Sequence, residues 1–280
     1  DGAELAAAGG SAPPQPALSP RAGTPNLLSP EERPHPLIDG MHLSTFVDGG
    51  PCPPAPEPAP EPGDGLALPE AVPASEPLHR SVRRRRSALD YLPEARASLQ
   101  DFAGILRESA VLPRCDFLGS LSGAAPRRLV DLHCFIHRVD DLAPGCYRYL
   151  PGRHALLAVR LGDVRAAAAG LSLGQELAGH AVAAFSMIAD LGRGARTFGN
   201  RAYRHAHVEA GMVGQGLYLA ATARGLDATG IGAFYDDDVH RWLGLVGRER
   251  QVIYHHSIGK AVVDPRLVDS DRPAEVRDVG

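Results

Sequence analysis

Four consecutive arginines followed by a serine, Arg83 to Ser87, are the clearest candidate anion site in the sequence. A guanidinium group donates paired hydrogen bonds to a phosphate, and a serine hydroxyl adds a further donor. If the run is helical, its five side chains cannot all point the same way, so two arginines and the serine would share one side. A solvated basic surface is the alternative explanation of the same run.

Three glycine-containing stretches offer groups for the same kind of ligand. The small residues from Gly119 to Ala125 would let backbone N–H groups reach an anion or a planar ring, although a plain connecting loop has the same composition. Gly230 and Gly232 mark the end of an expected strand, where the backbone is open to a ligand. Lys260 follows the last expected strand and could meet a phosphate.

The longest helical pattern begins at Arg201 and leads into a strand that ends near Gly232. Apolar residues recur along it at helical spacing. Three glycines interrupt it, although each interior glycine costs a helix about 1 kcal/mol relative to alanine: Gly211, Gly214 and Gly216. They indicate the close approach of another backbone or of a flat ligand. A core helix packed tightly on a sheet is the alternative.

The pattern of the remaining chain predicts an α+β domain. Helices and strands alternate irregularly, which favours a layered α+β fold over a regular parallel Rossmann order. There is no GxGxxG or P-loop motif, so neither a dinucleotide fingerprint nor a nucleotide triphosphate site is indicated. Expected helices cover residues 77–91, 98–110, 163–169, 174–180 and 236–243; expected strands cover residues 129–138, 145–150, 155–161, 181–188, 228–234 and 250–258; residues 191–200 are expected to be a loop.

The composition changes sharply after residue 77, because 18 of the 25 prolines precede that point. Such a segment buries too little apolar surface to offset its ordering entropy, so residues 1–77 are expected to be a largely disordered or extended arm. Residues 35–47 are its only apolar part and are expected to dock on a folded body. Residues 78–264 would form the folded domain and residues 265–280 a C-terminal tail.

Charge and composition argue against several classes of protein. The net charge of −4 gives no indication of nucleic-acid binding. No signal peptide and no apolar run of membrane-spanning length is evident, so no membrane association is expected. The histidine pairs at 205/207 and 255/256 have no third ligand nearby in sequence, so no metal site is expected. The four cysteines lack CxxC spacing and fit reduced thiols in a cytoplasmic protein: Cys52, Cys115, Cys134 and Cys146.

Several stretches, in this order, resemble the flavin-dependent nitroreductase-like superfamily and, within it, the SagB-type azoline dehydrogenases. Those enzymes oxidise thiazoline and oxazoline rings in ribosomally made peptides to azoles. The resemblance covers about Arg80 to Lys260 and is carried by RRRRSALDY with SLQDFAGILRESA, by GSLSGAAPRRLVDLHCFI, by the hairpin DDLAPGCYRYLP, and by GNRAYRHAHVEAGMVGQGLYLAATARGLDATGIGAF.

The resemblance implies a nitroreductase-like layered fold with a central, mostly antiparallel sheet flanked by helices. It also implies a homodimer that binds one FMN per site at the subunit interface. The positions carried over as FMN-binding are Arg85, Arg86 and Ser87 for the phosphate and ribityl chain, Ser120, Ser122 and Gly123 for the flavin loop, Gln215 on the long helix, Gly230 and Gly232 beside the ring or phosphate, and Lys260 for the phosphate.

Two departures from the family pattern concern the phosphate site and catalysis. Leu89 stands where many members carry a further arginine, so Arg84 or Lys260 would have to substitute. Azoline dehydrogenases typically read Lys-Tyr-Gly where this chain has Thr197-Phe198-Gly199. Neither threonine nor phenylalanine takes up a proton at neutral pH.

Tyr203 and His205 are the candidate catalytic residues, because they lie close in sequence to that loop. Residues four apart share a helical face, so Glu209 could orient His205 and poise its imidazole near neutral pH. A surface or core histidine is the alternative.

Three functions remain open. The first is an FMN-dependent dehydrogenase that oxidises thiazoline or oxazoline rings in a ribosomally made precursor peptide, docked with a cyclodehydratase partner. The second is an NAD(P)H-dependent flavin reductase of small electrophiles on the same fold. The third is a catalytically reduced assembly subunit of a peptide-modifying complex.

Overall fold

The computed structural model describes residues 31, 33–46, 57, 60–118 and 127–264. The chain divides into two units, Asp1–Gly40 and Met41–Gly280, and the second unit contains the sheet and the helices that pack on it. Within the described residues, no helix combines the length and the apolar character needed to cross a bilayer.

A seven-stranded antiparallel sheet forms the centre of the second unit, in the order β1-β4-β3-β2-β5-β7-β6. This confirms the predicted α+β class and the antiparallel character of the sheet. The β3–β4 hairpin was also predicted. The strands are β1 Leu66–Ala67, β2 Val130–Ile136, β3 Gly145–Leu150, β4 Ala155–Leu161, β5 Ala183–Asp190, β6 Asp227–Ile231 and β7 Arg250–Gly259.

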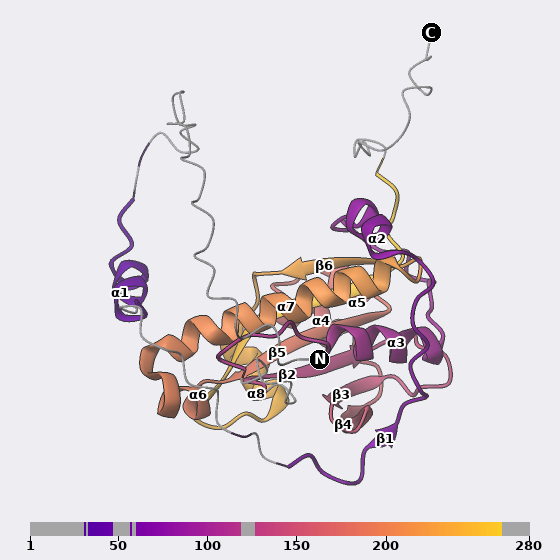
Figure 1. The fold of residues 1–280 in the computed structure, drawn as a ribbon. Coiled ribbons are helices and arrows are strands. Elements are labelled where there is room, and N and C mark those ends of the chain that lie inside the picture. Colours follow the sequence, from indigo (N-terminus) through magenta and orange to yellow (C-terminus); the bar gives the residue numbers. More distant parts are fainter. Residues whose placement is uncertain (1–30, 32, 47–56, 58–59, 119–126, 265–280) are drawn as a thin grey trace, which may run out of the picture. The chain divides into compact units, whose positions relative to one another are not determined.

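Helices cover both faces of this sheet (Figure 1). The long helix α7 lies beside α3 on one face, over a core that includes Phe102, Phe185 and Leu217. On the other face, α4, α5 and α8 enclose a second core around Phe135 and Ile188. The helices are α1 Pro36–Ser44, α2 Leu78–Arg84, α3 Leu99–Ser109, α4 Arg165–Leu171, α5 Glu176–His180, α6 Leu191–Phe198, α7 Ala202–Thr222 and α8 Asp236–Leu243, with a 3₁₀ turn at Gly199–Arg201.

The predicted loop at residues 191–200 is wrong, because most of it is helix α6. The Asp190 side chain caps this helix by accepting from Arg193 N at 2.8 Å. The two glycines of this helix allow neighbouring residues to approach closely and do not form a turn. A Cβ added at Gly192 would lie 2.7 Å from Glu249 Cβ, and one at Gly194 would lie 3.0 Å from Ala202 Cβ.

The predicted helix from residue 77 to 91 is also wrong in its extent, because α2 ends at Arg84. After it, Ser87 forms an isolated bridge with Ala228 of β6, and Ala88 N donates to Ala228 O at 3.1 Å. Pairing with a sheet edge therefore replaces helix in this segment. As a result, Arg85 to Ser87 run out of the helix and along the edge of β6.

Two elements lie within the segment expected to be an arm. Strand β1 pairs with β4, and Leu68 next to it is buried in the core. Helix α1 covers much of the apolar stretch expected to dock. At its end, Thr45 is buried and accepts from Arg201 through its carbonyl at 2.9 Å and from Arg204 Nε through its hydroxyl at 2.7 Å. Docking of residues 35–47 stays a prediction.

The glycines of α7 differ in what surrounds them, which gives a matched test. A Cβ at Gly216 would lie 2.8 Å from Ser109 Cα in the backbone of α3, whereas one at Gly211 would meet nothing within 4 Å. We expect Gly216→Ala to lower the free energy of unfolding by about 1–3 kcal/mol through overpacking. Gly211→Ala should raise it by about 0.5–1 kcal/mol through helix propensity. Urea unfolding of both variants measures this, and equal stabilities would contradict the close approach of α3 and α7.

Candidate cofactor site

The hydroxyl of Tyr218 joins three separate parts of the chain. Its oxygen lies 2.9 Å from Ser87 Oγ and accepts a hydrogen bond from Gly230 N at 2.8 Å. The Arg85 guanidinium lies over the Tyr218 ring, with its carbon 5.4 Å from the ring centroid. We call these four residues, Arg85, Ser87, Tyr218 and Gly230, the Tyr218 cluster.

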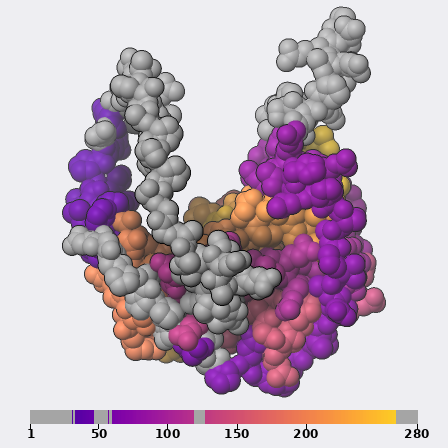
Figure 2. Space-filling view, in the orientation of Figure 1, coloured from indigo at the N-terminus to yellow at the C-terminus, as the bar shows by residue number. Residues whose placement is uncertain are grey.

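The sheet edge explains why these residues meet. Strand β6 is the last strand of the sheet, so its outer backbone groups have no further strand to pair with. Ala228 O is used by Ala88 N. Because groups two residues apart point to the same side, Gly230 N faces outward next to Ser87 and meets Tyr218. Figure 2 shows the purple surface of the α2 region against the orange surface of α7.

The side chains of the other predicted basic residues bind groups other than the Tyr218 ring. Arg84 forms an ion pair with Glu76. Arg86 donates to the carbonyl groups of Arg83 and Arg85 at 3.2 and 3.1 Å. Lys260 Nζ donates to Gly225 O at 2.9 Å, near the start of β6. Gly259 pairs with the first residue of β6, which is three strand residues, or about 10 Å, from Gly230.

Glycines 230 and 232 differ in their surroundings. A Cβ at Gly230 would lie 1.8 Å from the hydroxyl oxygen of Tyr254, so only glycine fits beside that ring. A Cβ at Gly232 would meet nothing within 4 Å. Gln215 is exposed and lies three residues before Tyr218, on the same side of α7.

The predicted flavin loop, Ser120, Ser122 and Gly123, lies outside the described residues. Its two flanks are close together, because Arg127 N donates to Leu118 O at 2.8 Å. Among the described residues, no group of three or more His, Cys, Asp or Glu side chains is arranged to hold a metal ion.

The predicted catalytic residues lie at the other end of α7. Tyr203 is 40% exposed, and its ring centroid is 4.3 Å from that of His207. His205 is buried between Phe117 and Phe198, at centroid distances of 4.5 and 4.7 Å. Burial lowers the pKa of His205, and Arg201 lowers it further. Thirteen helical residues, or about 20 Å, separate His205 from Tyr218, so a single chain does not bring the two sites together.

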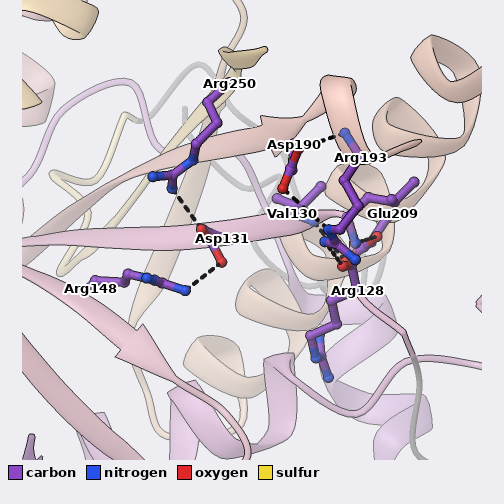
Figure 3. A network of polar contacts seen from close by, with 9 residues as sticks. Arg128, Val130, Asp131, Arg148, Asp190, Arg193, Glu209 and Arg250 are labelled. Carbon is purple, nitrogen blue, oxygen red and sulfur yellow. Dashed lines mark hydrogen bonds and ion pairs between the residues drawn. The ribbon is translucent and has the colours of Figure 1, made fainter. Parts of the chain in front are cut away.

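Glu209, expected as a partner of His205, is fully buried beneath the start of β2 (Figure 3). Its carboxylate accepts hydrogen bonds from Leu129 N at 2.7 Å and from Val130 N at 3.2 Å. Burial raises the pKa of Glu209 to about 7, while these two bonds and Arg128 oppose the rise. The carboxylate therefore anchors the segment that follows the predicted flavin loop.

Asp131 continues this polar network across the sheet (Figure 3). Its carboxylate binds Arg148 of β3 at 3.3 Å and Arg250 of β7 at 2.7 Å. Because Asp131 lies on β2, this one side chain ties three strands together close to Glu209.

Three aromatic residues of this region were missed from the sequence. Tyr218 lies one helical turn after Gln215, and that spacing was the available signal. Tyr254 and His256 alternate along β7 on the α7 side of the sheet. His256 is fully buried at a centroid distance of 4.8 Å from Tyr218, and neither ring nitrogen has a hydrogen-bond partner within the described residues. Burial lowers the pKa of His256 to about 3.

Part of the chain is similar to known proteins. Residues 138–260 match the nitroreductase family. A protein of Methanocaldococcus jannaschii assigned as a nitroreductase is 31% identical over 116 residues, which are 41% of this chain and 59% of that protein. The chain thus spans less than two thirds of this relative.

Solved structures align with a larger share of the chain and establish its fold. A protein from Anabaena variabilis assigned as a nitroreductase aligns with a TM-score of 0.63 at 25% identity, over 84% of this chain and 49% of the other. The E. coli microcin synthetase complex with truncated pro-MccB17 bound contains a chain that aligns with a TM-score of 0.55 at 19% identity, over 81% of this chain and 92% of the other. The second unit therefore has a nitroreductase-like fold.

Proposed function

We propose that this chain, whose residues 138–260 match the nitroreductase family, is an FMN-dependent oxidoreductase that binds the cofactor phosphate at the Tyr218 cluster. The observation that carries the proposal is the convergence of a guanidinium, a hydroxyl and a backbone N–H at one sheet edge. Arg85, Ser87 and Gly230 supply these groups. They come from stretches that are far apart in sequence and that each resemble the family.

The residues present fit a phosphate-bearing cofactor. All three groups donate hydrogen bonds, and a guanidinium matches the geometry of a phosphate. Lys260 adds a second cation along β6 and would turn from Gly225 O toward the ligand. Within the described residues, nothing lies within 4 Å of a Cβ added at Gly232, which suits contact with a flat ring.

We further propose azoline oxidation in a peptide as the reaction. Aromatising an azoline ring removes a hydride and a proton from adjacent carbons, and bound FMN supplies the hydride acceptor. The protein must supply a base for the carbon-bound proton. His205 suits that task chemically, because burial lowers its pKa and so favours the neutral imidazole, which is the form that can accept a proton. Tyr203 is the other candidate.

A second copy of the chain completes this proposal. His205 lies about 20 Å along α7 from Tyr218, so within one chain the candidate base is far from the residues proposed to hold the cofactor phosphate. A homodimer with the cofactor at its interface would bring the Tyr203 end of one protomer to the Tyr218 cluster of its partner. The shared fold with a chain of the microcin synthetase complex, which has truncated pro-MccB17 bound, supports a peptide substrate and a partner protein. The azoline-dehydrogenase resemblance is the ground for proposing a cyclodehydratase as that partner.

Incubation of the FMN-loaded protein with a thiazoline-containing peptide tests the reaction. We expect the peptide to lose two mass units, with oxygen as the acceptor. The Tyr203→Phe/His205→Ala double variant should lose most of this activity while it still binds FMN. Unchanged turnover in the double variant would exclude both residues as the base. Rapid bleaching of the flavin by NAD(P)H, with no change in the peptide, would favour a reductase instead.

One contact favours a catalytically reduced assembly subunit as a second candidate. Phe198 stands where the azoline dehydrogenases that the chain resembles typically carry tyrosine, and its ring packs against His205. This contact separates the His205 imidazole from a substrate, and His205 is one of the two candidate bases. A chain that cannot be loaded with FMN, yet binds a cyclodehydratase, would support that function.

A further inference from the structure

The Tyr218 hydroxyl occupies hydrogen-bonding groups that a phosphate would need. Gly230 N has a single hydrogen and donates it to Tyr218 at 2.8 Å. The same phenol oxygen lies 2.9 Å from Ser87 Oγ. A ligand anion can use Gly230 N–H only if the phenol gives it up.

We propose that Tyr218 is a displaceable internal ligand, which lowers the affinity of this site for phosphate-bearing ligands and leaves when one binds. This inference rests on the proposed FMN site and adds a residue that regulates its affinity.

The negative charge of a phosphate makes it a stronger acceptor for Gly230 N–H than the Tyr218 hydroxyl. A phenol is a neutral acceptor, whereas hydrogen bonds to a phosphate oxygen are charge-assisted and roughly twice as strong. Arg85 lies against the Tyr218 ring, so an anion that replaces the hydroxyl also gains a nearby positive charge. The phenol therefore holds Gly230 N–H while the site is free and yields it to an anion.

The Tyr218 ring is held by a packing contact that does not involve its hydroxyl, so the hydroxyl can be removed without loss of that contact. The ring packs edge-on against buried His256 at 4.8 Å. A phenylalanine at this position keeps that contact and the Arg85 contact while it loses only the oxygen. The substitution Tyr218→Phe thus isolates the competition from the packing.

Isothermal titration of FMN and, separately, of inorganic phosphate into the full chain tests the inference. We expect Tyr218→Phe to bind both ligands about fivefold more tightly than the wild type, because one hydrogen bond need no longer be broken. Tyr254→Phe is the matched control, since its hydroxyl also adjoins Gly230 but has no hydrogen bond in the described part of the chain. It should leave both affinities unchanged.

The outcomes separate this inference from the proposed function. Equal or weaker binding by Tyr218→Phe, with FMN bound by the wild type, would overturn the inference and leave the proposed function standing. Tighter phosphate binding by the variant without any FMN binding would support the inference and refute the proposed function. If neither protein binds either ligand, both fail.

A measurement on the wild type keeps the inference testable if Tyr218→Phe does not fold. The amide resonance of Gly230 should shift when phosphate is added, because its hydrogen bond changes from a phenol to an anion. The amide of Thr229, the preceding residue on β6, provides an internal reference. Phosphate binding that leaves the Gly230 resonance unmoved would overturn the inference.

Discussion

Replacing Glu209 by alanine is expected to lower the free energy of unfolding by about 3–5 kcal/mol. The carboxylate is fully buried and accepts from Leu129 N and Val130 N. Without it, both buried backbone donors lose their partner inside the protein. Urea denaturation followed by circular dichroism measures the change.

Glu209→Gln is the matched control, because it keeps the size and one acceptor oxygen. The amide nitrogen then faces a backbone N–H, so we expect a smaller loss of about 1–3 kcal/mol. An alanine variant within about 1 kcal/mol of the wild type would show that the carboxylate does not anchor β2.

The same carboxylate should make stability depend on pH. The folded-state pKa is about 7, above the ordinary value of 4.5. Between these pH values the native state holds a proton that the unfolded chain releases. The contribution of protonated Glu209 to the free energy of unfolding is therefore complete below pH 4.5, and it is lost as the pH rises to about 7. Relative to Glu209→Gln, the wild type should lose up to about 3 kcal/mol over that range.

Replacing Arg85 by alanine is expected to weaken FMN binding about 10- to 100-fold. A charge-assisted hydrogen bond contributes about 1.5–3 kcal/mol, which corresponds to this change in dissociation constant. Arg85 is half-buried, and its guanidinium already lies over the Tyr218 ring. Fluorescence titration of FMN measures the affinity.

Arg83→Ala is the control for this prediction, because Arg83 belongs to the same basic run but is exposed on α2. Its loss removes an equal charge and should change the affinity less than about threefold, since exposed charges contribute little. Equal losses in both variants would mean that general charge, rather than the Tyr218 cluster, attracts the cofactor.

Local patterns predicted the parts of the fold that local forces determine. The helical period of α7 and the turn of the β3–β4 hairpin are both carried by short sequence spacing. The failures are cases in which distant contacts decide. Helix α2 stops at Arg84 although arginine favours helix, because Ala88 pairs with the edge of β6. The glycines of α6 resembled a loop, but they make room for Glu249 and Ala202.

The candidate site shows the same division. Sequence motifs selected Arg85, Ser87 and Gly230, and the structure brings them together. Tyr218 was missed because only the sheet edge determines which helical side chain meets Gly230. Glu209 was paired with His205 through helical spacing, whereas its carboxylate binds backbone groups about 80 positions earlier. Spacing along a helix cannot reveal such a long-range partner.

The visible spectrum of the protein after incubation with FMN and gel filtration tests the central claim most directly. We expect retained flavin absorbance, with about one flavin per chain by the proposed stoichiometry, and less retention in Arg85→Ala. A wild-type protein that is folded but emerges colourless, and that gives no signal when FMN is titrated, would contradict a flavin site at the Tyr218 cluster.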